Sequence, residues 1–234
     1  MAKAQYTVLS LGGSIVIPKS GFDPDFLRLL QTFILDRVKK GQRFIIVVGG
    51  GTTARQYIGG LEQTLPKVTD ADKDWVGIYA TWLNARFVHK LFAEHAYKDI
   101  MIDPRENVKT SKPIIIAGGW KPGWSTDYVA TLHAKRVGAK HVLNLSNIEY
   151  AYDKDPNVHV DAVKIEKIDW KNFRKIVGNT WQAGASAPFD PIASREAEKL
   201  GLTVSLVKGT YLKEVGKAID GKKFRGTVIA PDVD

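Results

Sequence analysis

The chain has 234 residues, 44% of them hydrophobic, which is enough to bury the core of one large α/β domain or two joined lobes. It contains no cysteine, which excludes disulfides and thiolate metal sites and favours a reducing, cytoplasmic location. The formal net charge of +9 is dispersed and no apolar run is as long as a membrane span, so we expect small anionic partners rather than nucleic acid or a membrane.

The first third of the chain alternates short apolar runs with longer amphipathic segments. Residues 6–11 and 44–48 are apolar or β-branched, which predicts strands buried on both faces. Residues 22–40 between them carry an apolar stripe at helical spacing. A second helix is expected to open at 52–58, directly after the triple glycine at 49–51.

The rest of the chain continues this alternation. We expect helices at 72–95, 125–136, 169–176 and 190–200, and strands at 100–102, 113–117, 141–145, 203–207 and 227–229. Such an order predicts a three-layer α/β sandwich, in which helices cover both faces of a mostly parallel central sheet.

Three glycine-rich turns each follow one of the apolar runs, at Gly12-Gly13, at Gly49-Gly50-Gly51 and at 118–123. In an open parallel sheet, ligands bind at the carboxyl ends of the strands. Glycines there let backbone N–H groups approach an anion without a Cβ in the way. Three such turns at one edge predict a site for several phosphates, and therefore a phosphoryl-transfer enzyme.

The triple glycine opens a helix, and the free N–H groups and dipole of a helix N-terminus favour anions. Arg55 lies one turn into this helix, where its guanidinium suits a bidentate contact to phosphate. The alternative is a tight turn beside a solvated arginine. A Walker loop is excluded because no Gly-Lys-Ser/Thr follows, and no Gly-x-Gly-x-x-Gly fingerprint occurs.

Two aspartates stand near predicted helix starts. Asp127 follows the third glycine turn, where a carboxylate beside phosphate-binding glycines needs a cation or a lysine partner. Ser125 just before it is a good helix cap. Asp190 precedes Pro191, and for Asp190 alone capping is the favoured interpretation.

A polar, aromatic loop follows the strand at 141–145. Tyr152 in this loop has a ring suited to lie against a nucleotide base, and Asp155-Pro156 marks a turn. The five histidines are scattered without metal-ligand spacing, and the six tryptophans form no stripe, so we expect most tryptophans to be packing residues or interface anchors. Taken alone, the loop is a weak sign of nucleotide binding.

Taken in order along the chain, these features resemble the amino acid kinase family and are most similar to its archaeal-type uridylate (UMP) kinases. The resemblance rests on Gly12-Gly13-Ser14, Val47-Val48-Gly49-Gly50-Gly51, Ala54-Arg55, Asp74, Gly77-Ile78, Ala80-Thr81, Asn84-Ala85, Gly118-Gly119, Pro122-Gly123, Ser125-Thr126-Asp127, Asn147, Tyr152, Asp155-Pro156, Gly184, Asp190-Pro191 and Gly226-Thr227. Any one of these is common, but the ordered set is specific.

The resemblance implies transfer of the ATP γ-phosphoryl group to UMP in pyrimidine nucleotide biosynthesis, with Mg²⁺ and a homohexameric assembly. It also implies an acceptor lobe at 1–138 and an ATP-binding lobe at 139–234. The residues implied for each role are Gly12, Gly13, Asp127 and Asp190 for catalysis, with the two aspartates also holding Mg²⁺; Gly50, Gly51, Arg55, Asp74 and Thr126 for UMP; and Ser10, Gly13, Asn147, Tyr152, Asp155 and Pro156 for ATP.

The chain departs from the family pattern at two places. Ser10 stands where many members have lysine, so Mg²⁺, Arg55 or another lysine such as Lys208 must neutralise the transition state. The usual Asp-Gly-Val-Tyr of the nucleotide loop is Glu-Tyr-Ala-Tyr at 149–152, which reshapes that loop. The alternatives are a kinase of another small anion, such as isopentenyl phosphate or carbamate, and a non-catalytic anion-storing or regulatory protein.

Overall fold

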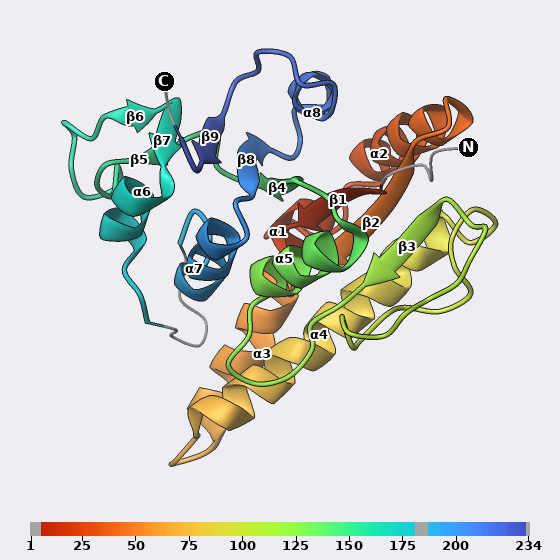
Figure 1. The fold of residues 1–234 in the computed structure, drawn as a ribbon. Coiled ribbons are helices and arrows are strands. Elements are labelled where there is room, and N and C mark those ends of the chain that lie inside the picture. Colours follow the sequence, from red (N-terminus) through yellow and green to blue (C-terminus); the bar gives the residue numbers. More distant parts are fainter. Residues whose placement is uncertain (1–5, 181–186, 233–234) are drawn as a thin grey trace.

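The computed structural model describes residues 6–180 and 187–232, and it has three layers (Figure 1). Within these residues the central sheet has seven strands in the order β3-β2-β1-β4-β8-β9-β7. Neighbouring strands are parallel except for the antiparallel pair β8 and β9. The prediction of a three-layer, mostly parallel α/β sandwich is confirmed. Gly184 and Trp181 lie outside the described residues.

The strands of the sheet are β1 (Tyr6–Leu11), β2 (Arg43–Val48), β3 (Ile114–Ala117), β4 (His141–Ser146), β7 (Lys167–Asp169), β8 (Thr203–Lys208) and β9 (Thr227–Ala230). A separate small hairpin pairs β5 (Ala151–Tyr152) with β6 (Lys164–Ile165). The helices are α1 (Gly13–Val16), α2 (Pro24–Lys39), α3 (Gly51–Thr64), α4 (Asp70–Leu91), α5 (Thr126–Val137), α6 (Trp170–Val177), α7 (Pro191–Lys199) and α8 (Leu212–Ile219).

Some predicted elements need correction. The strand expected at 100–102 is wrong: only Met101 forms an isolated bridge, to Ala117 at the edge of the sheet. The sequence pattern also missed α1, α8, β7 and the β5–β6 hairpin. All of these are short, and α8 contains Gly216, which lowers helix propensity. That glycine allows close approach of α2, because Arg37 Nη2 donates to the Gly216 carbonyl at 3.1 Å.

The apolar core is divided by the sheet into two clusters. One cluster fills the face covered by α5, α6 and α7, and it includes Trp170 and Phe173. The other fills the face covered by α2, α4 and α8, and it includes Ile34, Val88 and Val215. Both faces of the central strands are therefore buried, as their continuous apolar runs predict.

The register of the parallel strands brings several turns to one edge of the sheet. Leu11 at the end of β1 is paired with Val48 of β2 and with Leu145 of β4. The turn after β1 donates from Gly12 N to the Leu145 carbonyl at 2.8 Å, and Gly49 N donates to the Leu11 carbonyl at 2.9 Å. The glycine turns after β1 and β2 thus start side by side.

We expect His133 to make the fold sensitive to acid. This side chain is buried in α5, and burial together with Arg136 lowers its pKa to about 3. The ordinary pKa of histidine is about 6.5. Below that pH, His133 is therefore protonated in the unfolded chain but stays neutral in the folded chain. The contribution of neutral His133 is therefore complete above pH 6.5 and is lost as the pH falls toward 3, by up to about 1.4 kcal/mol per pH unit.

The measurement is the free energy of unfolding in urea at pH 7 and pH 5, for the parent and for His133→Gln. Glutamine does not titrate, so the difference between the two pH values should be smaller in the variant. Titrations elsewhere in the chain cancel in this comparison. An identical pH dependence in both proteins would mean that His133 has the same pKa in the folded and unfolded chain, which would contradict this account.

Candidate active site

The first two glycine turns pack backbone against backbone. A Cβ built on Gly13 would lie 2.3 Å from the Gly49 carbonyl oxygen and 2.5 Å from Gly51 N. Gly51 has φ +55°, a backbone conformation that is strained in residues with a side chain. Residues with a Cβ do not fit at either position, so the two turns form one continuous backbone surface.

Helix α4 holds the second and third glycine turns in place. The buried Asn84 side chain donates to the carbonyls of Gly49 at 2.9 Å and Gly50 at 3.0 Å. Thr81, one turn earlier, accepts from Gly119 N at 2.6 Å through its hydroxyl. Both residues belong to the family pattern, but nothing in the sequence indicates these contacts.

Three hollows lie along this edge of the sheet, and we name them by position. The central hollow includes Ser10, Gly12, Gly13, Asp127 and Asn144 in its lining. The α4 hollow includes Lys73, Asp74, Gly77, Thr81 and Trp124. The hairpin hollow includes Tyr150, Tyr152, Asp155, Pro156 and Ile176.

The hollows share parts of their walls. Gly50, Gly51, Arg55 and Thr126 line both the central and the α4 hollow. Ser146, Asn147, Ala187 and Pro188 line both the central and the hairpin hollow. The three therefore form one groove with the Gly12-Gly13 turn near its middle.

Asp127 lies in the central hollow and is held by neutral donors. Its Oδ1 accepts from the Ser10 hydroxyl at 2.8 Å and from Asn144 Nδ2 at 3.2 Å, and its Oδ2 accepts from the backbone N–H of Asp190 at 3.2 Å. Burial and the nearby charge of Asp190 raise the pKa of Asp127 to about 6. Among the described residues, no lysine or arginine forms an ion pair with it.

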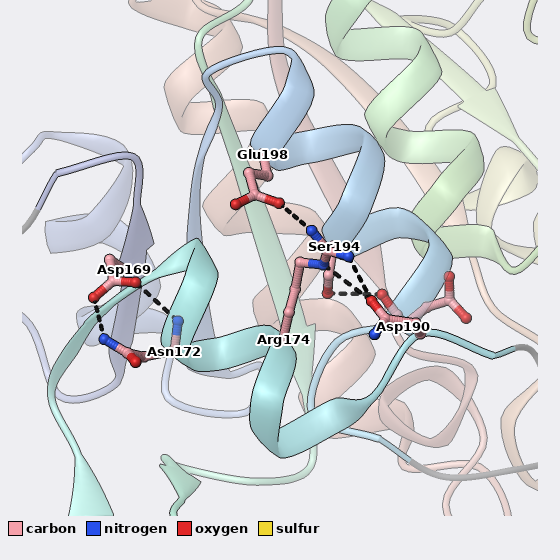
Figure 2. Close-up of polar contacts among 7 residues, drawn as sticks. Asp169, Asn172, Arg174, Asp190, Ser194 and Glu198 are labelled. Atoms are coloured by element: carbon pink, nitrogen blue, oxygen red, sulfur yellow. Dashed lines mark hydrogen bonds and ion pairs between the residues drawn. The ribbon is translucent and has the colours of Figure 1, made fainter.

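Asp190 caps α7, as the sequence favoured. Its carboxylate accepts from Ala193 N at 2.6 Å, and the Ser194 hydroxyl donates to its carbonyl at 2.8 Å. Figure 2 shows this cap beside the ion pair at 2.5 Å between Arg174 of α6 and Glu198 of α7. Burial raises the pKa of Asp190. The residue meets Asp127 through its backbone N–H, its carboxylate is engaged in the cap, and it lies outside the described lining of the three hollows.

Arg55 connects the central and α4 hollows. Its Nη2 donates to the Ser14 hydroxyl at 2.8 Å and to Thr52 Oγ1 at 3.4 Å, which draws the guanidinium toward the glycine turns. The side chain is nevertheless exposed, so its remaining N–H groups are accessible from the groove. Arg55 therefore supplies a positive charge next to the triple glycine.

The α4 hollow brings together all five residues that the resemblance assigned to UMP, and it adds two side chains that were not predicted, Lys73 and Trp124. Asp74 accepts from Gly123 N at 2.6 Å, which ties the third glycine turn to α4. Lys73 lines the same hollow and forms an ion pair with Glu62 at 2.7 Å. Trp124 also lines it, with its ring stacked on Tyr128 at a centroid distance of 4.2 Å. Trp124 is thus more than a packing residue, a distinction for which the sequence carried no signal.

The hairpin hollow collects the loop residues that the resemblance assigned to ATP. Asn147, Tyr152, Asp155 and Pro156 all line it. Asp155 Oδ1 also accepts from the backbone N–H of Asn157 at 2.9 Å, which closes the turn. Tyr150, which departs from the family pattern, lines the same hollow, and Lys164 Nζ lies 4.8 Å from the centroid of the Tyr150 ring. The altered loop therefore forms part of the wall of this hollow.

Two carboxylates are available for a divalent cation. Within the described part of the chain there is no cluster of three or more His, Asp or Glu side chains suited to a metal ion. Asp127 and Asp190 provide carboxylate oxygens, and Mg²⁺ is commonly held by one or two carboxylates together with substrate phosphates. Asp127 fits this pattern better, because Asp190 is committed to the helix cap. Lys208 lies outside the described lining of the three hollows, with Nζ 4.8 Å from the Tyr211 ring.

Comparisons with known proteins identify the family and the fold. A sequence model of the amino acid kinase family matches residues 5–208. The uridylate kinase of Pyrococcus abyssi is 33% identical over 227 residues, covering 96% of this chain and 99% of its own length. That of Methanococcus maripaludis strain C7 is 31% identical with the same coverage.

Solved structures have the same fold. The crystal structure of uridylate kinase from Archaeoglobus fulgidus has a TM-score of 0.79 at 29% identity, and the match covers 97% of this chain and 100% of that one. UMP kinase from Bacillus anthracis has a TM-score of 0.76 at 16% identity over 98% of this chain and 97% of its own, which is a likeness of fold. The chain belongs to the amino acid kinase family.

Proposed function

We propose that the protein is a UMP kinase, which transfers the γ-phosphoryl group of ATP to UMP and gives UDP and ADP. The observation that carries this is the continuous groove, which has room for one nucleotide at each end and a glycine backbone between them. Relatives that match nearly the whole chain are named uridylate kinase, which favours UMP over isopentenyl phosphate, carbamate or a non-catalytic role. ADP release and UDP formation from UMP and MgATP test the proposal.

The α4 hollow is the proposed acceptor site. The UMP phosphate lies on the N–H groups of Gly50 and Gly51 and against Arg55, where a helix N-terminus and a cation both favour it. Asp74 accepts the ribose hydroxyls, and Thr126 lies at the junction with the central hollow. The Trp124 ring offers a flat face for the pyrimidine.

The hairpin hollow is the proposed ATP site. Tyr152, Asp155 and Pro156 surround the nucleoside, and Asn147 lies where this hollow meets the central one. The triphosphate then extends toward Ser10, Gly12 and Gly13. The acceptor lining falls within 1–138 and the hairpin lining within 139–234, which supports the expected division into an acceptor lobe and an ATP-binding lobe.

Phosphoryl transfer between two phosphates needs alignment and charge neutralisation more than a base. The acceptor is already an anion, so no strong general base is required. The glycine N–H groups and Arg55 neutralise developing charge on the transferred group. Asp127, with Asp190 beside it, would hold Mg²⁺ together with ATP. The cation would supply the remaining positive charge and relieve the repulsion between these two carboxylates.

Arg55→Ala is expected to weaken the use of UMP. It removes a charge-assisted contact worth about 1.5–3 kcal/mol, so kcat/KM for UMP should fall roughly tenfold to a hundredfold, with little change in KM for ATP. Arg28→Ala, which removes an exposed arginine on α2, is the control and should leave both constants unchanged. An Arg55→Ala enzyme with parental kinetics for UMP would place Arg55 outside the acceptor site.

We also propose a homo-oligomer, a hexamer by family resemblance, in the cytoplasm and in pyrimidine nucleotide biosynthesis. Helices α3 and α4 extend together beyond the sheet (Figure 1). Several large apolar side chains on them are exposed: Tyr57, Trp75, Tyr79 and Leu83. An exposed apolar patch of this kind favours an interface between subunits. No helix in the described residues combines the length and apolarity that a membrane crossing requires.

A further inference from the structure

A fourth hollow lies at the opposite edge of the sheet from the proposed active site. It has a volume of about 640 Å³ and is lined at the strands by His141 of β4 and by Thr203 and Ser205 of β8. His141 begins the strand whose last residue, Ser146, lines the central hollow. Six residues of extended chain span about 17 Å, so this amino-end hollow is separate from the groove.

The amino-end hollow exists because helix α8 stops short on one face of the sheet. Side chains alternate along a strand, so His141 shares a face with Leu143, and Ser205 with Val207. Leu143 and Val207 are covered by α2 and α8, whereas beyond Ala218 the strand residues of this face are the polar His141, Thr203 and Ser205. His141 Nε2 lies 2.8 Å from the Ser205 hydroxyl, and together they form a polar floor.

The rim of this hollow is strongly basic. Lys140, Lys167, Lys222 and Lys223 line it, with Glu166 as its single acid among the described residues. Glu166 already forms an ion pair with Lys164 at 2.8 Å. The nearby Asp220 is likewise held by Arg37 at 2.8 Å. Lys140, Lys222 and Lys223 form no ion pair in the part of the chain that the structure describes, although Lys223 lies close enough to Glu166, and Lys222 to Asp220, to lower the pKa of those acids. With four lysines and one acid in its described lining, the rim carries an excess of positive charge.

One wall of the hollow is aromatic. Phe224 is half-buried between the basic loop residues and the sheet, and it lines the cavity. The cavity volume is within the range of small-molecule sites, which combine an apolar wall with a few placed polar groups. Four lysines around a polar floor match a compact, highly charged anion better than an extended chain.

We propose that the amino-end hollow is a second binding site, and that it takes a small molecule carrying a triphosphate group. The lysines of the rim hold the phosphates, and the His141–Ser205 floor provides neutral hydrogen-bonding groups beneath them. Inorganic triphosphate and a nucleoside triphosphate share this chemistry. Phe224 distinguishes them, since a ring contributes to binding a nucleoside and contributes nothing to inorganic triphosphate.

The test is calorimetric titration of the full chain with inorganic tripolyphosphate at low salt. The expected result for the parent is two sites per chain, one in the groove and one in the amino-end hollow. Lys222→Glu combined with Lys223→Glu should lower the affinity of one site by about a hundredfold or more and leave the other unchanged. Both lysines are exposed in the loop after α8, so the melting temperature should stay at the parental value.

The matched control is Lys90→Glu combined with Lys109→Glu, which changes the net charge equally at exposed positions outside the described lining of all four hollows. It should retain both sites. Binding in the parent that the Lys222→Glu and Lys223→Glu variant fully retains, or equal losses in the two double variants, would overturn the proposal, because binding would then be confined to the groove or follow net charge. A single site in the parent that this variant loses would still be the amino-end hollow. Displacement of tripolyphosphate from this site by single-stranded RNA at matched phosphate concentration would also overturn it, in favour of a nucleic-acid surface.

The source of the triphosphate is decided by ATP titrations of the parent and of Phe224→Leu, which keeps apolar volume and removes the ring. A nucleoside triphosphate as ligand predicts that the variant loses about tenfold in ATP affinity at the second site and none in tripolyphosphate affinity. Equal affinities in both proteins would identify inorganic triphosphate as the ligand. Both readouts are binding, so they stand or fall independently of UMP kinase activity.

Discussion

Asp127→Asn is expected to abolish most turnover, by at least about a hundredfold, while the protein melts at or above the parental temperature. The side chain keeps its size and can still accept from the Ser10 hydroxyl. Burial and the nearby charge of Asp190 raise the pKa of Asp127, so a neutral replacement removes a charge that the fold disfavours, and this gain offsets the hydrogen bond that it loses from the Asp190 N–H. The proposed mechanism, in contrast, needs the negative charge to hold Mg²⁺ beside the phosphates.

The matched variant is Asp190→Asn, which retains the helix cap because asparagine caps as well as aspartate. It also retains the backbone N–H that donates to Asp127. We expect a smaller loss of turnover than for Asp127→Asn. Turnover and thermal melting measured on both variants separate catalysis from stability, and near-parental turnover in Asp127→Asn with parental melting would eliminate Asp127 as a catalytic residue.

Gly13→Ala is expected to abolish turnover and to destabilise the fold. The new Cβ would overlap the Gly49 carbonyl and Gly51 N, and both are backbone atoms that cannot rotate away. Overpacking of this kind costs about 1–3 kcal/mol, which corresponds to a decrease of about 3–10 °C in Tm for a chain of this length. Turnover should be lost even at temperatures where the variant remains folded, because the displaced turn is the one proposed to face the transferred phosphoryl group.

Gly59→Ala is the control for this substitution. Gly59 lies inside α3, where a Cβ meets nothing within 4 Å, and alanine favours the helix. This variant should keep its activity and gain slightly in Tm. Scanning calorimetry and steady-state turnover check both variants, and a Gly13→Ala enzyme as active and as stable as the parent would show that the two turns do not pack as described.

The sequence predicts best what depends on neighbouring residues. The glycine turns follow apolar strands, so the edge of the sheet with the proposed active site could be located from local pattern alone. The cap by Ser125, which accepts from Tyr128 N at 3.1 Å, and the cap by Asp190 could be predicted for the same reason. The order of the parallel strands then brings these turns together.

Features that depend on contacts distant in the sequence could not be predicted. Asn84 is 35 residues from Gly49, and its position inside α4 gives no sign that it holds a glycine turn. Trp124 lines the α4 hollow, next to Gly123, whose N–H donates to Asp74 on α4, 49 residues earlier. The apolar residues at 100–102 follow the pattern of a strand, yet only Met101 reaches the sheet, because the segment meets β3 at a single bridge.

The most direct test of the central claim is a panel of acceptors assayed with MgATP at one concentration, following ADP release. The panel contains UMP, CMP, AMP and isopentenyl phosphate, and the reaction with UMP is checked for UDP. The account predicts the highest kcat/KM with UMP, because the groove places one nucleotide at each end of the Gly12-Gly13 turn. Faster turnover of any other acceptor, or no ADP release with the whole panel, would contradict it.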